Sequence, residues 1–346
     1  MDLTHDLVAA VRAAGAANTP LRIEGGGTRA FYGRAVDATL LSVAGHRGVV
    51  DYDPSELVVT ARAGTPLAEV EALLAAEGQM FCFEPPSFGA AGTLGGAVAT
   101  GLSGPRRPFA GALRDYVLGA KLLDGRGEVL RFGGTVFKNV AGFDAFRLQA
   151  GALGCLGAVL EVSIRVAPRP RVETALAFEI EGEAARARVV ELMRRPLPLS
   201  GAFHDGTRLH LRLSGGEAAV AAARRELGGD VEALGIWAAI RDLRHPALLG
   251  SPVLWRIAGP QTAALPDLAG AAWDWGGGVR WLKADRIDPT IWDLAAGAGG
   301  HATLFRGAED QVFQPLVPPL FNLHRRVKAA LDPQGLFNPG RMYEGL

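Results

Sequence analysis

The chain has 346 residues, and its 36 Lys and Arg side chains are balanced by 36 Asp and Glu side chains, so the formal net charge is zero. A neutral chain has no global positive field to attract nucleic acid or anionic lipid, although a local basic patch stays open. The length indicates about two domains. The two cysteines, Cys82 and Cys155, exclude a disulfide framework and indicate a reducing compartment.

The amino-terminal segment Met1–Asp6 is acidic and lacks a signal-peptide pattern. The longest uncharged apolar stretch, near residues 150–160, is too short to cross a bilayer. The expected location is therefore the cytoplasm. Glycine is in excess, with 46 residues against the ~7% of an average protein. A GC-rich genome can explain a general excess of glycine, but not the clustering of glycines in particular loops.

The first 170 residues predict short helices and strands separated by glycine-rich loops. A helix is expected over 4–16, and another after Thr65-Pro66, because a hydroxyl cap followed by proline favours a helix start. Arg114–Leu123 and Glu128–Phe132 flank Asp124-Gly125 and predict a hairpin. Further strands are expected at 21–23, 38–43, 49–52 and 57–62, a half-buried strand at 158–166, and a helix at 144–153.

The pattern changes after Pro168-Arg169-Pro170, which is a plausible domain boundary. The expected order is then strand, helix, two hairpin strands, helix and strand, at 172–180, 183–195, 202–204 with 208–213, 217–227 and 231–237. This order is typical of a ferredoxin-like unit. A further hairpin is expected at 273–281 and a final helix at 320–331. The fold class predicted from these elements is α+β.

A first glycine loop follows the strand at 21–23. Gly25-Gly26-Gly27-Thr28-Arg29-Ala30 fits G-x-G-x-x-A, a weak dinucleotide signature. A Rossmann unit also needs a helix directly after the loop, and none is predicted here. The alternative is a nest of backbone N–H groups that binds a pyrophosphate, with Thr28 adding a hydroxyl donor. Taken alone, the loop also fits a turn without any ligand.

A second loop favours the ligand-binding interpretation. Pro85-Pro86-Ser87-Phe88-Gly89 leads to Thr93-Leu94-Gly95-Gly96, where Thr93 is expected to cap a short helix whose free N–H groups face an anion. Two such loops in one predicted domain are harder to explain as simple turns. A third cluster, Gly154-Cys155-Leu156-Gly157, leads directly into the strand at 158–166.

Taken together, the motifs resemble those of a known family. The triple-glycine loop, Thr93–Gly96, Arg114-Asp115-Tyr116-Val117-Leu118-Gly119, Gly142-Phe143-Asp144 and Gly154–Gly157 follow the order found in the PCMH-type, or vanillyl-alcohol oxidase-type, FAD-binding flavoproteins. The tail Leu331-Asp332-Pro333-Gln334-Gly335-Leu336-Phe337-Asn338-Pro339-Gly340-Arg341-Met342 resembles the closing motif of their 2-hydroxyacid oxidase branch. The length and the short middle region are similar to the smaller FAD-binding subunits of bacterial glycolate oxidases.

This resemblance implies the domain organisation and the cofactor site. FAD would lie between two α+β subdomains of a PCMH-type domain at 1–170, with a ferredoxin-like, cap-type domain at 171–310 and a C-terminal segment at 311–346 that returns to the FAD domain. The residues implied to bind FAD are Gly25, Gly26, Gly27, Thr28, Pro85, Thr93, Gly95, Gly96, Arg114, Asp115, Gly157, Val162, Asn338 and Arg341. The first loop has no His or Cys to tether a flavin, so the expected FAD is non-covalent.

The resemblance also implies partner subunits. Hydroxyacid-oxidising members carry an H-x-G-x-G motif in the cap, whereas this chain has only His204-Asp205-Gly206, so no catalytic residue is assigned. The implied partners are a larger FAD-containing glycolate oxidase subunit that oxidises the small 2-hydroxyacid and an iron–sulfur subunit that accepts electrons. Attachment to the inner membrane would be peripheral, through these partners. Two alternatives stay open: a self-sufficient dehydrogenase with His204, His210 or His301 as base, and a non-catalytic scaffold subunit.

Other side chains allow both a chemical and a structural interpretation. His204 and His210 lack further ligands at a recognised spacing, so no metal site is predicted. Ser103 lies outside a G-x-S-x-G nucleophile elbow. A structural interpretation is favoured for two further sets, packing for Trp273, Trp275 and Trp281 and a solvated loop rather than a partner or anion site for Arg106-Arg107. For Arg114-Asp115 an ion pair is the structural alternative, and the position in the family motif favours cofactor support.

Overall fold

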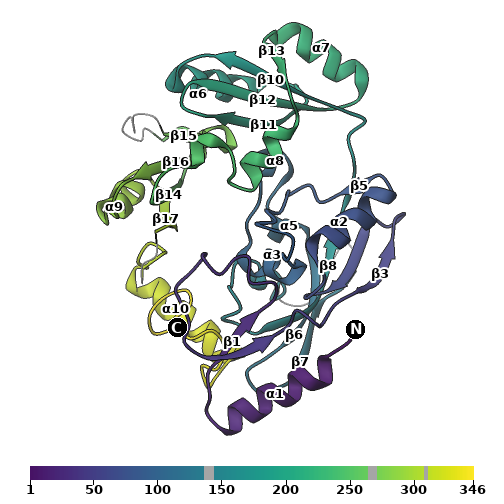
Figure 1. Ribbon diagram of the computed structural model, residues 1–346, viewed down its shortest axis with the longest axis vertical. Helices are drawn as coiled ribbons and strands as arrows, with labels where there is room; N and C mark the ends of the chain where they lie inside the picture. Colours follow the sequence, from purple (N-terminus) through teal and green to yellow (C-terminus); the bar gives the residue numbers. More distant parts are fainter. Residues whose placement is uncertain (136–143, 264–270, 308–310) are drawn as a thin grey trace.

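The computed structural model describes residues 1–135, 144–263, 271–307 and 311–346, in two lobes that lie one above the other (Figure 1). The N-terminal lobe contains the first nine strands, and the cap lobe contains an eight-stranded sheet. Gly142 and Phe143 of the predicted motif, and the predicted boundary at residue 310, lie outside the described residues.

The N-terminal lobe has a small parallel pair and a larger antiparallel sheet. The pair is β1 (Leu21–Glu24) and β2 (Thr39–Ser42), packed against α1 (Thr4–Ala16). The larger sheet has the order β3 (Val49–Asp53), β4 (Val58–Arg62), β8 (Ala158–Arg165), β6 (Val117–Leu123) and β7 (Val129–Gly133). The remaining elements are α2 (Leu67–Ala76), β5 (Gln79–Met80), α3 (Leu94–Thr100), α4 (Arg107–Ala110), α5 (Leu113–Tyr116), η1 (Arg147–Gln149) and β9 (Ala167–Pro168).

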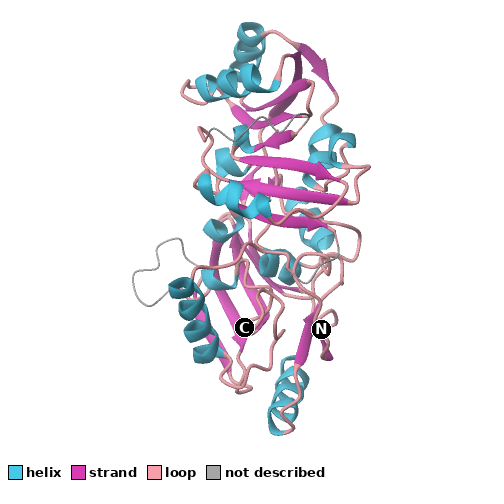
Figure 2. Ribbon diagram, turned by 90° about the vertical axis from the view of Figure 1, so that its left-hand side faces the viewer, coloured by secondary structure: helices cyan, strands magenta, loops and turns pink. Residues whose placement is uncertain are grey.

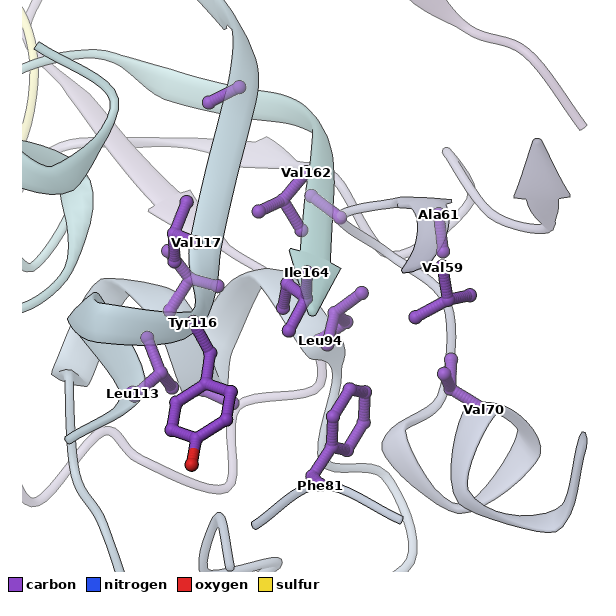
Figure 3. Close-up of a cluster of buried hydrophobic side chains, with 14 of the residues drawn as sticks. Val59, Ala61, Val70, Phe81, Leu94, Leu113, Tyr116, Val117, Val162 and Ile164 are labelled. Atoms are coloured by element: carbon purple, nitrogen blue, oxygen red, sulfur yellow. The ribbon is translucent and has the colours of Figure 1, made fainter. Parts of the chain in front are cut away.

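The core of this lobe lies between the larger sheet and helices α2 and α3. Figure 3 shows Leu94 of α3 beside Ile164 of β8 and Val70 of α2 beside Val59 of β4, all within one buried cluster. The strand β8 was expected to be half-buried, but six of its eight residues are buried. The reason is that Leu160 and Ala158 pack on the other side against α1, β1 and β2. The strand therefore forms the centre of the lobe rather than one of its surfaces.

Three local predictions in this lobe are wrong. Thr65 does not cap α2, because its hydroxyl donates to the Arg62 carbonyl at 2.7 Å and accepts from the Gly48 N–H at 2.9 Å. Arg114 and Asp115 do not begin a strand, since they lie in the single helical turn α5. The helix expected at 144–153 is reduced to the 3₁₀ turn η1, because Ala150 is extended, with a ψ of 102°, and Gly151 has a φ of +94°.

The cap lobe begins with the predicted ferredoxin-like unit. Its elements are β10 (Val172–Glu179), α6 (Gly182–Leu192), β11 (Leu199–His204), β12 (Arg208–Gly215), α7 (Glu217–Leu227) and β13 (Asp230–Glu232), and the antiparallel strands are ordered β13-β10-β12-β11. The last strand is shorter than predicted, because residues from Gly235 onward form α8 (Gly235–Arg241). Trp237 and Ile240 of α8 are buried against the cap sheet.

The same sheet continues through the second half of the cap lobe. The single pairing His204↔Trp273 joins β11 to β15 (Ala272–Asp274), followed by β16 (Val279–Ala284), β14 (Val253–Ala258) and β17 (His301–Arg306). The predicted hairpin at 273–281 is confirmed as β15–β16. The connecting elements are η2 (Pro246–Leu248), η3 (Trp275–Gly277) and α9 (Thr290–Gly297).

The C-terminal segment returns to the N-terminal lobe. Figures 1 and 2 show α10 (Pro318–Leu331) and the C-terminus at the level of β1, away from the ferredoxin-like unit. The buried Lys328 ammonium donates to the carbonyls of Cys155 and Phe337 and to Asp332, at 2.8–2.9 Å. These contacts bring the tail, residues 332–346, beside the first glycine loop. No helix in the described ranges is both long and apolar enough to cross a membrane.

Candidate cofactor site

The two glycine loops line one cavity, which we name the glycine-loop cavity. It occupies about 650 Å³, including its opening to solvent, between the loop at 22–30, the start of α3 and the tail. Eight residues expected at the cofactor site line it: Gly25, Gly26, Gly27, Thr28, Thr93, Gly96, Asn338 and Arg341. Segments that are more than 60 and 300 residues apart in the sequence are therefore brought together at one place.

The first loop consists of glycines because the second loop approaches it closely. A Cβ atom on Gly25 would lie 2.5 Å from the Thr93 hydroxyl, and one on Gly26 would overlap with the Ala91 carbonyl oxygen. Gly27 has a φ of +69°, which side chains rarely adopt. Within the described ranges, the backbone N–H groups of residues 25–28 donate to no protein acceptor. Four unpaired N–H groups in succession are suited to bind an anion.

The second loop contributes in a different way from the one expected. Thr93 is confirmed as the cap of α3, since its hydroxyl accepts from the Gly96 N–H at 3.2 Å. The N–H groups of Leu94 and Gly95 are not free, however, because they donate to the carbonyls of Thr65 and Ala63 at 2.9 and 2.8 Å. Gly95 faces Ala63 of the core, where a Cβ atom would lie 2.6 Å from the Ala63 Cβ. The second loop therefore supplies a close wall rather than free donors.

The tail holds the first loop in place. The Asn338 side chain accepts from the Ile23 N–H at 2.8 Å and donates to the Leu153 carbonyl at 2.6 Å. The Arg341 guanidinium donates to the carbonyls of Ala30 and Tyr32 at 2.9 and 3.0 Å. The Arg341 charge is thus used mainly to fix the backbone after the loop. Both residues act on the cavity by positioning its wall.

Arg29 is a site residue that the sequence analysis missed. It lines the cavity and is only 7% exposed; it donates to the Thr28 hydroxyl at 3.3 Å and to the Pro86 carbonyl. Its Nε is buried without a partner among the described residues. Burial lowers the pKa of Arg29 to about 10, which leaves the group cationic at neutral pH. The sequence feature that could have identified Arg29 as a site residue is its position directly after Gly25-Gly26-Gly27-Thr28.

The other predicted cofactor residues do not line this cavity. Val162 is 1% exposed in the core, and Gly157, with a φ of +141°, packs against Leu122. Arg114 and Asp115 are exposed and lie 3.6 Å apart as an ion pair. Pro85 is buried beside Pro86, which lines a second cavity between the lobes.

The histidines considered as bases or metal ligands lie in other surroundings. His204 is buried, stacks on Trp273 and bonds the Ile180 carbonyl through Nε2 at 2.9 Å. His210 lies between Glu232 and Asp205, at 2.9 and 3.3 Å. One potential ligand atom each of Asp205, His210 and His245 lies within 4.8 Å of the others, but both ring nitrogens of His210 already contact carboxylates. His301 is exposed at the edge strand β17.

The cavity residues fit the diphosphate of a dinucleotide. Unpaired backbone N–H groups, the Thr28 hydroxyl and the buried Arg29 cation together complement two adjacent negative charges. Side-chain-free residues allow the ligand to approach the backbone closely. Of the lining residues that the structure describes, none is His or Cys.

Comparisons with known proteins agree with this geometry. Residues 3–133 match the FAD binding domain family, and residues 305–342 match the C-terminal domain of FAD linked oxidases. The chain is 48% identical over 346 residues to the glycolate oxidase subunit GlcE of Escherichia coli K12, which covers 100% of this chain and 99% of that protein.

Two more distant similarities differ in how much of the chain they cover. The glycolate oxidase subunit GlcD of Bacillus subtilis is 30% identical over 142 residues, which is 41% of this chain and 30% of that protein. The solved structure of alkyldihydroxyacetonephosphate synthase has a TM-score of 0.68 and 15% identity, and covers 97% of this chain and 75% of that chain. This last similarity concerns the fold alone.

Proposed function

Because the chain belongs to the GlcE family of FAD-linked oxidases, we propose that it is the FAD-binding subunit of a glycolate (2-hydroxyacid) oxidase complex. In this role it takes part in the oxidation of glycolate to glyoxylate by flavin-mediated electron transfer. The observation that carries the proposal is the convergence of unpaired N–H groups at 25–28 with Arg29 in one cavity.

The cofactor contacts are proposed residue by residue. The N–H groups of Gly25–Thr28 and the guanidinium of Arg29 bind the diphosphate, while Thr93 and Gly96 form the facing wall. Asn338 and Arg341 hold the loop in its binding conformation. The bound FAD supplies the two-electron redox chemistry. The chain orients it without a covalent bond, since none of the described residues that line the cavity is His or Cys.

The domain organisation and the partners belong to the same proposal. Residues 1–170 form the FAD-binding domain, 171–310 the cap-like domain, and 311–346 the segment that returns to the FAD domain. The partners are a larger FAD-containing subunit and an iron–sulfur subunit. This chain cannot hold a four-cysteine cluster itself, because it has two cysteines.

The first test is a spectrum of the purified chain. Absorption bands near 370 and 450 nm, roughly where oxidised flavins absorb, are expected, and filtration after denaturation should release all the FAD. An Arg29→Met variant should bind FAD about 10- to 100-fold more weakly, because a hydrogen bond to a charged group contributes about 1.5–3 kcal/mol. Arg47→Met, which changes an exposed arginine, is the matched control. A chain that neither contains nor rebinds FAD contradicts the proposal.

Rapid mixing with glycolate separates a dependent subunit from a self-sufficient dehydrogenase. If the partner subunit oxidises the substrate, the flavin of the isolated chain stays oxidised on the time scale of turnover of the complex. Rapid bleaching of the isolated chain would instead support self-sufficiency. Full turnover of a complex whose Arg29→Met chain is first stripped of FAD, with its absence checked by the spectrum, would support a scaffold role.

A further inference from the structure

A side-chain cluster in the cap lobe combines two histidines with two carboxylates, and we name it the cap histidine cluster. Its members are His210 of β12, Asp205 of the β11–β12 turn, His245 directly before η2, and Glu232 of β13. None of these four is among the described residues that line the glycine-loop cavity or the cavity between the lobes. The cluster is therefore separate from the proposed cofactor site, and the function proposed above does not use it.

Three of these side chains lie close enough together to share one metal ion. One ring nitrogen each of His210 and His245 and one carboxylate oxygen of Asp205 lie within 4.8 Å of one another. The Asp205 Oδ2 and His210 Nε2 atoms are 3.3 Å apart. Zinc bonds of about 2.0–2.1 Å at tetrahedral angles place two ligand atoms about 3.3–3.4 Å apart, so this pair already has the spacing of two ligands. A small movement of the half-buried His245 brings in the third.

The hairpin turn holds Asp205 so that one of its oxygens faces the cluster. Its Oδ1 atom accepts the N–H groups of Thr207 and Arg208 at 2.8 and 2.7 Å, and the Thr207 hydroxyl at 2.9 Å. These bonds fix the carboxylate, and its other oxygen, Oδ2, is directed at His210. A carboxylate that the turn already orders loses little further side-chain entropy when it binds an ion.

Glu232 orients His210 from the other side of the ring. Its two carboxylate oxygens lie 2.9 and 3.0 Å from Nδ1 of His210. A metal-bound histidine usually donates its second ring N–H to a carboxylate, which fixes the ring and makes it a stronger ligand. The two contacts of His210 are therefore compatible with a metal ion. In the metal-free chain Nε2 faces Asp205; an ion displaces the Nε2 proton to solvent, and the bond from Nδ1–H to Glu232 is kept.

His245 is the side chain of the cluster with the fewest polar contacts. Among the described residues its ring makes no ion pair, and its one hydrogen bond is the Ala247 N–H donated to Nδ1 at 3.3 Å. Its ring lies 5.1 and 5.9 Å from the rings of Phe203 and His210. The spacing of histidines in the sequence does not indicate this group, because His245 reaches the hairpin only through the fold.

The charge and the ligand types of the cluster suit a divalent transition metal. With both histidines neutral, Asp205 and Glu232 leave two negative charges around the site. The neighbouring Arg208 is directed away from it, since its guanidinium pairs with Glu179 at 2.7 Å and Asp230 at 3.6 Å. Two imidazole nitrogens and one carboxylate favour Zn²⁺ and its neighbours over Mg²⁺ and Ca²⁺, which prefer oxygen ligands.

We infer that the cap histidine cluster binds one divalent transition-metal ion, for which Zn²⁺ fits best, through Asp205, His210 and His245, with water in the fourth position. Glu232 is a positioning residue. The ion joins the β11–β12 hairpin to the segment after α8. That segment contacts the N-terminal lobe through Asp242, which accepts the Ser87 N–H at 3.0 Å. The role of the ion is therefore structural, because it braces the cap lobe at this contact.

Titration of the full chain with Zn²⁺, after EDTA treatment and removal of the chelator, tests the inference. The wild-type chain should bind one Zn²⁺ with a dissociation constant of about 1 μM or lower, and excess Mg²⁺ should not displace it. Asp205→Asn, which keeps an oxygen for the turn bonds, and His245→Ala should each weaken binding by about 100-fold or more, and Glu232→Gln by about 10- to 100-fold. His5→Ala, which removes a histidine whose side chain is 98% exposed, is the control and should bind as the wild type does.

X-ray absorption of the zinc-loaded wild-type chain gives a second test that needs no variant. Only nitrogen and oxygen neighbours at about 2.0–2.1 Å are expected, with the outer-shell scattering of two imidazole rings. A sulfur neighbour at about 2.3 Å would place the ion at Cys82 or Cys155 and overturn the inference. Several weak sites, or unchanged affinity in both Asp205→Asn and His245→Ala, would indicate an adventitious ion only and also overturn it.

Stability measurements test the structural role and separate it from the cofactor proposal. Zn²⁺ should raise the urea midpoint of the wild-type chain but not that of His245→Ala, because a ligand that binds only the folded state stabilises it. Bound zinc without any stabilisation would overturn the structural role. The FAD-free chain should bind Zn²⁺ as tightly as the FAD-loaded chain. A chain that binds zinc but no FAD therefore contradicts the cofactor proposal alone, and one that binds FAD but no zinc overturns this inference alone.

Discussion

At the scale of single residues, the cofactor cavity depends on side chains that bond to backbone rather than to a ligand. Asn338 is the clearest case, because its amide joins Ile23 before the first glycine loop to Leu153 in the third cluster. It is 4% exposed and has a φ of +44°, a conformation that asparagine tolerates better than most residues. Its role in the family motif is therefore understandable without any contact to FAD.

Asn338→Ala should destabilise the protein by about 2–3 kcal/mol, because it leaves a buried N–H and a buried carbonyl without partners. It should also weaken FAD binding, since the loop at 25–28 is no longer fixed. Urea unfolding and FAD titration measure the two effects. Asn322→Ala on the exposed side of α10 is the control and should stay within about 0.5 kcal/mol of the wild-type chain. Equal effects of the two variants would contradict the positioning role.

At the scale of elements, the β11–β12 hairpin carries a histidine that is charged by its neighbours. His210 on β12 contacts Glu232 of β13 and Asp205 of the turn, with His245 nearby. Burial alone lowers the pKa of His210, but its hydrogen bonds and charge interactions with Glu232 and Asp205 raise it above the ordinary 6.5. The Asp205 carboxyl is itself held ionised, with a pKa of about 2, by hydrogen bonds that outweigh its burial.

The contribution of His210 to the stability of the chain should therefore decrease as the pH rises. A folded-state pKa above the unfolded value means that the stabilisation by His210 is complete below about pH 6.5 and is lost as the pH passes through the raised pKa. The loss should be on the order of 1–3 kcal/mol. Between pH 6 and pH 9, the difference in urea midpoint between the wild-type chain and His210→Gln should therefore become smaller. Parallel curves for the two proteins would refute this assignment.

At the scale of the whole molecule, a buried ion-pair cluster joins the lobes. Glu84 contacts Arg212 of the cap sheet at 2.7 Å and Arg106 at 3.4 Å, and Arg106 also contacts Glu173 of β10 at 2.6 Å. Arg106 was expected in a solvated loop, but its side chain is 9% exposed. That expectation is wrong because the cap lobe covers the loop. The composition of the loop itself gives no information about this contact with a distant segment.

Glu84→Gln should destabilise the protein by about 3–5 kcal/mol, since it leaves two buried guanidinium groups insufficiently compensated. The cap lobe should then become susceptible to proteolysis before the N-terminal lobe unfolds. Glu183→Gln, which changes an exposed partner of Arg186, is the control and should change stability by about 0–1 kcal/mol. A single unchanged unfolding transition for Glu84→Gln would show that the cluster does not couple the lobes.

The sequence by itself determined the α+β class, the ferredoxin-like order of the cap and both glycine loops, because periodicity, turn residues and side-chain-free segments are local properties. It did not determine that β8 is central, that Leu94 and Gly95 use their N–H groups within the core, or that Arg29, Arg106 and Arg256 are buried. Only the tertiary structure decided these points. Whether a side chain is buried, and which partner a donor or a charged group finds, depend on segments that are up to about 300 residues away in the sequence. A single sequence contains no local pattern that identifies which of these distant segments come into contact.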